Sequence, residues 1–191
     1  MSYEIAKASD SISGGLIAGT KNTEVAKATG RFRMECYDKD GILKWTAESQ
    51  NLVVNVGLQY MAGTALTSTT QITTWYIGLY GAGASNTPAA GDTMASHAGW
   101  TEVTPYAGNR PTATFAAATN ANPSVVTNTA SPASFSINAT QTVGGAFLTS
   151  NNTAGGSTGT LFSAADFQSP GDRNVVSGDT LNVSYTFSLA G

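Results

Sequence analysis

The sequence predicts an all-β fold, mainly antiparallel, arranged as a β-sandwich or jelly roll with one short helix and an extended N-terminal arm. Three observations indicate this fold. Two alternating runs joined by a turn fill residues 31–48, several short strand-like segments follow one another in the second half without helices between them, and residues 181–189 alternate throughout. The sequence contains no repeat with a period of about 20–50 residues, which argues against a solenoid or a propeller.

The composition favours one folded unit whose surface carries few charges. A chain of 191 residues fits one domain plus an extension. Charged residues make up 11% of the chain, against about 25% in an average domain. The surface must therefore consist mainly of Ser, Thr, Asn, Gly and Ala. Such a surface suits extended protein contact, because uncharged polar groups lose little when a neighbour dehydrates them.

Residues 1–29 are predicted to form an arm, and residues 30–191 the folded body. The arm has few large apolar side chains and is rich in Ser, Ala, Gly, Lys and Thr, so we expect order only where it touches something. An assembly arm and a frayed terminus both agree with this composition. The apolar anchors of the arm are Ile5, Ile12, Leu16 and Ile17.

Charge is distributed unevenly along the chain, whose formal net charge is −3. Seven of the nine Lys and Arg residues precede Trp45, namely Lys7, Lys21, Lys27, Arg31, Arg33, Lys39 and Lys44. A mildly basic start on an acidic body is compatible with docking to an acidic partner and with ordinary solubility. We expect no nucleic-acid binding, because the sequence has no dense Lys/Arg patch interleaved with aromatic residues.

Residues 31–48 predict a β-hairpin. Phe32, Met34 and Cys36 share one face of the first run, which is the pattern of a half-buried strand. Residues 38–41 supply the turn, since aspartates bond their own backbone and glycine tolerates a positive φ. As the only cysteine, Cys36 forms no intrachain disulfide, and we expect it to be a small core residue. The second run places three apolar residues on one face: Leu43, Trp45 and Ala47.

A short helix and a further strand are expected after the hairpin. Apolar positions in residues 56–66 recur at three- and four-residue spacing, with Asn55 as the predicted cap. Gly57 and Gly63 weaken this helix by roughly 1 kcal/mol each relative to alanine. Residues 73–80 then alternate, with aromatic side chains on both faces, which indicates a central strand or a subunit contact.

The second half of the chain begins with a long connection and continues as short strands. Residues 81–111 form the connection, in which we expect one helical turn at residues 92–97 and Trp100 as a buried anchor. Connections of this length are usually functional or packed against the domain. The strands expected after it cover residues 112–118, 124–129, 133–138, 143–149, 160–166 and 180–189.

No constellation of catalytic or metal-binding residues stands out, so we expect neither enzymatic activity nor a cofactor. Residues 155–159 match G-x-S-x-G formally, but they lie in an Asn/Gly/Thr-rich loop, and the single histidine, His97, precedes them. Residues 38–41 resemble part of a calcium loop that lacks its first and twelfth acidic ligands. We expect His97 to be packed or on a loop surface. The sequence leaves open a catalytic pair of carboxylates that are far apart in the chain and meet only in the folded protein.

We expect neither a signal peptide nor a membrane-spanning segment from the sequence. The N-terminus has no basic stretch followed by a continuous apolar run, so it is not expected to be a signal peptide. No segment approaches the roughly 20 apolar residues that span a bilayer. We therefore expect the chain to be made and folded in a cytosol, without export by the general secretory route and without contact with a membrane.

Five stretches of the chain resemble a family of small structural proteins of tailed bacteriophages. The similarity runs from about Gly30 to the C-terminus, whereas residues 1–29 are not covered. Three motifs within the stretches are distinctive as a set, and each is weak by itself: the DG-x-L-K-W hairpin, the NLV segment and the final SGDTLNV strand. The five stretches are YDKDGILKW, NLVVNVGLQYMA, WYIGLYGAG, GDTMASHAGWTEVTPY and NVVSGDTLNVSYTF.

The resemblance implies a virion component located at the capsid surface. The expected function is that of a capsid decoration or cement protein of β-sandwich or jelly-roll type, which binds the major capsid protein as a homotrimer. Many weak contacts across a repeating lattice supply the affinity of such a protein. The candidate partner-binding residues are the early cations and two strand tyrosines: Lys7, Lys21, Lys27, Arg31, Arg33, Tyr76 and Tyr80.

Two alternatives stand beside this prediction. One is a tail-associated or head-fibre receptor-binding module, in which an aromatic loop around His97, Trp100 and Tyr106 binds carbohydrate. The other is a depolymerase or another hydrolase. The first is a binding function and the second an enzymatic one, so a glycan array and a polysaccharide-shortening assay distinguish them.

Overall fold

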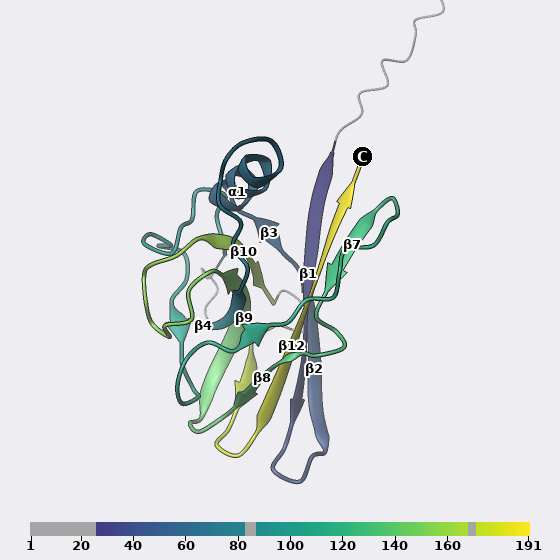
Figure 1. Cartoon of the computed structure of the whole chain (residues 1–191). Helices are drawn as coiled ribbons and strands as arrows, with labels where there is room; N and C mark the ends of the chain where they lie inside the picture. The colour runs from purple at the N-terminus through teal and green to yellow at the C-terminus, as the bar shows by residue number, and fades with distance from the viewer. Residues whose placement is uncertain (1–25, 83–86, 168–170) are drawn as a thin grey trace, which may run out of the picture.

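The fold is a β-sandwich in which two antiparallel sheets pack face to face (Figure 1). The computed structural model describes residues 26–82, 87–167 and 171–191. The all-β sandwich and the single short helix expected from the sequence are confirmed for these residues. Lys7 and Lys21 lie outside the described residues, as does the arm up to residue 25.

Sheet A is built around two long strands. Among the described residues it contains β1 (Lys27–Tyr37), β2 (Leu43–Gln50), β7 (Ser124–Thr127), β8 (Ala133–Ser136) and β12 (Thr180–Ala190). β1 and β12 pair along their whole length, with Lys27 opposite Ala190 and Tyr37 opposite Thr180. β2 flanks β1, while β7 and β8 pair with different parts of β12.

Sheet B is built around β9 and carries the helix at one end. Its described strands are β3 (Leu52–Val53), β4 (Trp75–Gly81), β5 (Glu102–Val103), β6 (Thr112–Ala113), β9 (Gln141–Thr149), β10 (Leu161–Asp166) and β11 (Arg173–Val175). β9 pairs with β4 on one side and with β10 and β11 on the other. The helix α1 (Asn55–Leu66) follows β3 and lies against β10.

The main core lies between the sheets and is filled by alternate residues of the long strands. Completely or almost completely buried members from both sheets include Phe32, Met34, Cys36, Ile77, Leu79, Leu148, Leu181 and Val183. The alternation predicted for β1 is therefore confirmed. Burying a large apolar side chain contributes about 1.5–3 kcal/mol, so these strands supply much of the stabilisation.

A second hydrophobic cluster covers the outer face of sheet B. Tyr80 and Phe147 alternate with core residues on their strands, so they point away from the main core. Trp100 covers them and is 2% exposed, with ring centroids 5.3 Å from Tyr80 and 5.0 Å from Phe147. The long connection is thus packed onto the sheet, and the prediction that Trp100 anchors it is confirmed.

The helix α1 begins without a side-chain cap and lies close to sheet B. Its N-cap is Val54, which makes no side-chain capping bond, so the predicted cap at Asn55 is wrong. A Cβ placed on Gly57 would lie 2.3 Å from the backbone oxygen of Phe162. Glycine at this position therefore permits the close contact between α1 and β10.

The remaining differences from the expectation concern boundaries and very short strands. β1 begins at Lys27, three residues before the expected start of the body at residue 30. The strand expected at residues 112–118 is limited to β6, and the helical turn expected at residues 92–97 is a turn closed by a β-bridge. Periodicity does not predict β3, β5 or β11, because two or three residues are too few to show a period.

Candidate functional site

The predicted partner-binding residues do not form one surface. Side chains of β1 alternate, which places Arg31 and Arg33 on the outer face of sheet A, with Lys27 at its end. The same alternation in β4 places Tyr76 and Tyr80 on the outer face of sheet B. The described members of the predicted set are therefore divided between opposite faces of the sandwich.

Acidic neighbours compensate the arginines of β1. Arg31 forms an ion pair with Glu48, and Arg33 Nη2 lies 2.6 Å from Glu35 Oε1. The Tyr37 hydroxyl also donates to Glu35, at 2.9 Å. The hydrogen bonds from Tyr37 and Arg33 lower the pKa of Glu35. The outer face of sheet A is thus a face of mixed charge and not a basic patch.

Tyr80 is not available to a partner, which corrects its prediction as an interface residue. Its side chain is 0% exposed because Trp100 and its connection cover it. Burial raises the pKa of Tyr80, and the charges of Asp166 and Asp172 raise it further. Tyr76 remains partly exposed.

The aromatic loop considered for carbohydrate binding is closed. Trp100 is 2% exposed and Tyr106 is 7% exposed. The His97 ring stacks on Trp100 with centroids 3.9 Å apart, and its Nδ1 lies 2.9 Å from the Trp100 carbonyl oxygen. The prediction of a packed histidine is confirmed, and neither buried ring offers a free face on which a sugar stacks.

The two glycine-containing motifs lie in turns and loops. The Asp38 carboxylate accepts the backbone N–H groups of Asp40 and Ile42, both at 2.9 Å, and Gly41 has a φ of +78°. The hairpin turn is therefore confirmed. Residues 155–159 lie in the loop between β9 and β10, where no helix follows, so they do not form the strand-to-helix turn of a G-x-S-x-G nucleophile.

An ion pair between the partly exposed Lys44 and the buried Asp179 lies at the end of sheet A away from the arm. The Asp179 side chain is 2% exposed and accepts Lys44 Nζ at 2.6 Å and the Val176 backbone N–H at 2.9 Å. The Cys36 thiol lies 3.6 Å from the same carboxylate. Burial, together with the Asp179 charge, raises the pKa of Cys36 to about 12. Cys36 is therefore a core residue, as predicted.

Protonation of Asp179 is expected to destabilise the fold in acid. Burial alone raises the pKa of this carboxyl, but the bonds from Lys44 and Val176 and the Lys44 charge outweigh it, so the pKa lies below its ordinary value. A carboxyl with a lower pKa in the folded state stabilises the fold above its unfolded pKa of about 3.9, and this contribution is lost as the pH falls through the folded pKa. Asp179→Asn should cost about 1–3 kcal/mol at neutral pH.

Urea unfolding between about pH 7 and about pH 3 checks this prediction. The Asp179→Asn variant should lose less stability than the wild type as the pH falls below about 4. Asp40→Asn, a change at an exposed turn residue, is the matched control and should keep the wild-type pH dependence. Equal pH dependence in the wild type and Asp179→Asn would contradict the assignment.

Arg110 forms a second, fully enclosed polar node. Its side chain is 0% exposed. The guanidinium donates to both Glu102 carboxylate oxygens, at 2.8 and 2.6 Å, and to the carbonyl oxygens of Asn151 and Gly156, at 2.8 and 2.9 Å. Glu102 also accepts the Gly155 N–H at 2.8 Å. The node ties the long connection to the loop between β9 and β10.

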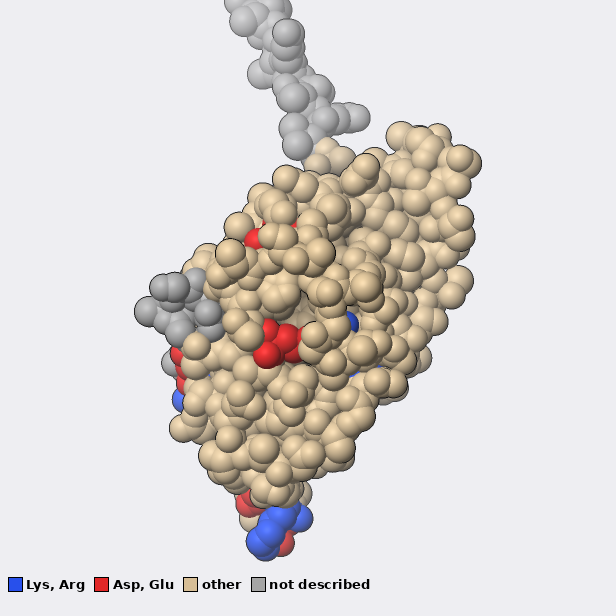
Figure 2. Space-filling view, turned by 90° about the vertical axis from the view of Figure 1, so that its left-hand side faces the viewer, with Lys and Arg blue, Asp and Glu red and all other residues tan. Residues whose placement is uncertain are grey.

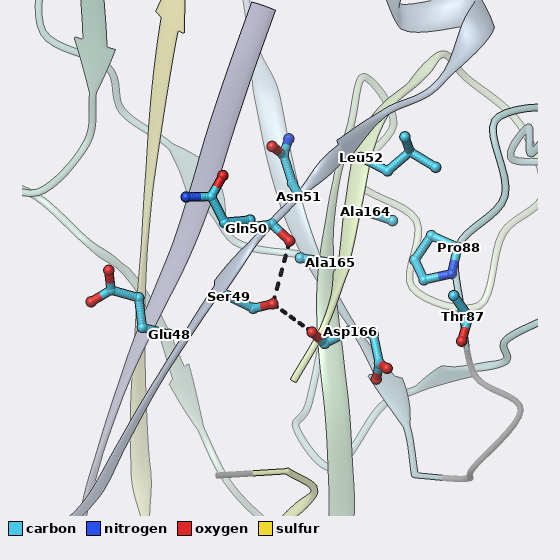
Figure 3. Close-up of a pocket in the computed structure, with 10 residues that line it drawn as sticks. All are labelled: Glu48, Ser49, Gln50, Asn51, Leu52, Thr87, Pro88, Ala164, Ala165 and Asp166. Atoms are coloured by element: carbon cyan, nitrogen blue, oxygen red, sulfur yellow. Dashed lines mark hydrogen bonds between the residues drawn. The ribbon is translucent and has the colours of Figure 1, made fainter. Parts of the chain in front are cut away.

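An open hollow of about 380 Å³ lies between the ends of β2 and β10 (Figure 3). Ser49 Oγ donates to the backbone oxygen of Asp166 at 2.5 Å. Burial and the Asp172 charge raise the pKa of Asp166. The carboxylates of Glu48 and Asp166 point away from each other (Figure 3), so the hollow does not present the facing pair that glycoside hydrolysis uses.

A smaller cavity of about 140 Å³ opens between the sheets, near the end where β1 begins. We call it the aromatic groove. Both sheets, α1 and the segment after β6 supply its walls, which carry Tyr60, Trp75, Phe115, Val126, Phe162 and Phe187.

The rings of the aromatic groove contact one another in series. Trp75 lies 5.4 Å from both Tyr60 and Phe162, measured between ring centroids, and Phe162 lies 5.5 Å from Phe187. Phe187 is only partly buried, and Leu189, the next residue on the same face of β12, is 40% exposed. The inward face predicted for β12 is therefore fully enclosed only in its first half.

Neither a metal site nor a membrane-spanning helix is found in the described part of the chain. No group of three or more His, Cys, Asp or Glu side chains among these residues is arranged to hold a metal ion. Within the same residues, no helix has the length and apolar character needed to cross a membrane. Comparison with known protein families, with curated proteins and with solved structures finds no match to this chain.

Proposed function

We propose that this chain is a structural protein of a tailed-bacteriophage virion, namely a decoration protein that binds the assembled major capsid protein as a homotrimer. The class comes from the resemblance of residues 30–191 to that family. The observation on the molecule that carries the proposal is a face on the side of sheet B that shows few charged residues, with one acidic group near its middle and a charged cluster at its lower end (Figure 2).

A face with few charges costs little free energy to dehydrate when another protein covers it. In Figure 2, Lys, Arg, Asp and Glu are visible at few places, and most of the surface belongs to other residues. Interface cores are depleted of charges, because a charge that loses its water without a partner is costly. The small exposed residues Ala95, Ser96 and Ala98 of the long connection permit close approach.

Hydrogen bonds and ring contacts within the chain give this face a fixed shape before binding. Arg110 and Glu102 join the connection to the loop between β9 and β10, and Trp100 fastens it to sheet B. A preformed surface avoids the entropy loss of ordering loops on association. Repetition of the same contact over a lattice then adds to the affinity of each one.

Negative charges on this face are expected to weaken capsid binding. Ala95→Glu/Ala98→Glu places two carboxylates on the connection, and both would be dehydrated in the complex. Co-sedimentation with capsids of the phage that encodes the chain should weaken about tenfold or more. Ser134→Glu/Ser136→Glu is the matched control, because both serines are exposed on β8 in sheet A. Equal binding by both variants would move the contact away from sheet B.

The location of the chain in the virus particle tests the proposed class directly. Gold-labelled antibody against the chain should mark the heads of purified particles. Label confined to tails would support the receptor-binding alternative, although Trp100 and Tyr106 no longer supply its sugar-stacking surface. Particles without any label would contradict a virion role.

A further inference from the structure

The aromatic groove has the size and chemistry of a site for aliphatic side chains. Its volume is about 140 Å³, and its walls are rings and aliphatic groups. An apolar cavity of roughly 150 Å³ holds a benzene-sized group. The rings of Phe115 and Phe187 are partly exposed at this site. Covering apolar surface yields about 25 cal/mol per Å², so an apolar occupant is stabilised there.

The arm leaves the folded body beside this groove. Phe187, a wall residue, pairs with Gly30, which is three residues from Lys27 at the start of β1. At about 3.4 Å per residue, the start of β1 is about 10 Å along the strand from the groove. Leu189 lies between Phe187 and the end of β12 and is 40% exposed. Apolar surface thus extends from the groove toward the arm.

The arm contains one apolar pair within reach of the groove. Leu16 and Ile17 are the only adjacent large apolar residues in residues 1–26, and Gly15 and Ala18 flank them. The ten residues that follow Ile17, up to and including Lys27, can extend over roughly 33–36 Å, so the chain has enough length to reverse and return. Tethering through a short linker supplies an effective concentration of about millimolar.

We propose that the aromatic groove is the binding site of the chain's own arm, with Leu16 and Ile17 as the inserted side chains. The bound arm covers Phe187 and Leu189. A segment of another molecule lacks the tether, so the arm of the same chain is favoured at low protein concentration. This inference does not depend on a role in a virion.

Indole N–H resonances of the full-length chain report on the groove, because the three tryptophans lie in different surroundings. Trp75 lines the groove. Trp45 Nε1 donates to the Asn174 carbonyl oxygen at 3.2 Å, and Trp100 Nε1 donates to Asp92 at 2.9 Å. Trp45 and Trp100 are therefore internal controls, and a Trp75→Phe variant assigns the Trp75 signal.

The Leu16→Ser/Ile17→Ser variant is expected to shift the Trp75 indole signal and to leave the other two indole signals in place. Ile5→Ser/Ile12→Ser is the matched control, since it also removes two large apolar side chains from the arm, and it should move none of the three. In the wild type, methyl groups of Leu16 and Ile17 should show nuclear Overhauser contacts to the Trp75 ring.

A sample that mixes isotope-labelled and unlabelled copies distinguishes the two possible sources of the arm. Contacts from Leu16 and Ile17 that arise within one copy support the proposal. Contacts found only between copies would assign the groove to the arm of a second molecule and overturn it. The proposal is also overturned if the Trp75 indole signal does not shift in Leu16→Ser/Ile17→Ser and the methyl groups of Leu16 and Ile17 show no contacts to the Trp75 ring. The arm would then not occupy the aromatic groove.

Discussion

Arg110→Met is expected to lower the free energy of unfolding by about 3–5 kcal/mol. Glu102 is only 7% exposed, so the variant leaves a buried carboxylate without its cation. The carbonyl oxygens of Asn151 and Gly156 lose their donor as well. Methionine keeps much of the side-chain volume, so the loss reports on the polar node more than on a cavity. Urea unfolding followed by tryptophan fluorescence measures it.

Two further variants isolate the contribution of burial. Arg31→Met removes the cation of the surface pair with Glu48, whose side chains are 54% and 42% exposed, and it should cost at most about 1 kcal/mol. Arg110→Met/Glu102→Gln should recover part of the loss, because a buried amide is less costly than a buried carboxylate. A cost for Arg110→Met no larger than for Arg31→Met would refute the node's structural role.

Gly57→Ala is expected to destabilise the protein by about 1–3 kcal/mol, although alanine is about 1 kcal/mol better than glycine within a helix. The added Cβ would lie 2.3 Å from the backbone oxygen of Phe162 and 3.0 Å from its carbonyl carbon. A backbone group cannot rotate aside, so α1 would have to move away from β10. Because Phe162 lines the aromatic groove, the same movement would alter the groove.

Gly63→Ala is the control for this prediction, since it lies on the same helix. Its added Cβ would lie 2.6 Å from Thr69 Oγ1, at the end of a side chain that can rotate. The gain in helix propensity should offset that displacement, so stability should change little. Thermal unfolding of both variants measures the difference. Equal effects at the two glycines would show that the contact with Phe162 does not limit the helix.

The long strands of the fold are predictable because burial of one face imposes a period of two. Phe32, Met34 and Cys36 follow that period and are all 0% exposed. In β12, Leu181 and Val183 follow it as well. A packed connection is equally predictable from its length and its single large anchor. These parts of the fold depend on local sequence alone.

The burial of Tyr80 is not predictable in this way. The aromatic residues of β4 occupy both faces, and their alternation does not tell whether the outer face is covered. Trp100 decides the question, and it reaches Tyr80 only because the connection folds back over sheet B. An aromatic residue on a strand therefore indicates an interface only once the path of the following segment is known.

Local sequence patterns do not predict the contacts of Arg110 either. In the sequence Arg110 is one cation before Pro111 in a long connection, where a solvated side chain is the usual outcome. Two of its acceptors, on Asn151 and Gly156, come from 41 and 46 residues further along the chain. The aromatic groove is not predicted from the sequence for a similar reason: its walls come from both sheets and the helix, which are far apart in the chain.

The pairing of β1 with β12 makes assembly of sheet A a late event during synthesis. Cys36 and Asp179 are in contact although 143 residues separate them. At a synthesis rate of about 5–20 residues per second, the first hairpin waits on the order of ten seconds for its neighbour. Throughout that interval its apolar face and a strand edge are open to other nascent chains. Charges on β2 such as Lys44 and Glu48 oppose strand-to-strand aggregation. A chaperone that shields the hairpin until β12 has been synthesised should therefore raise the yield of folded protein.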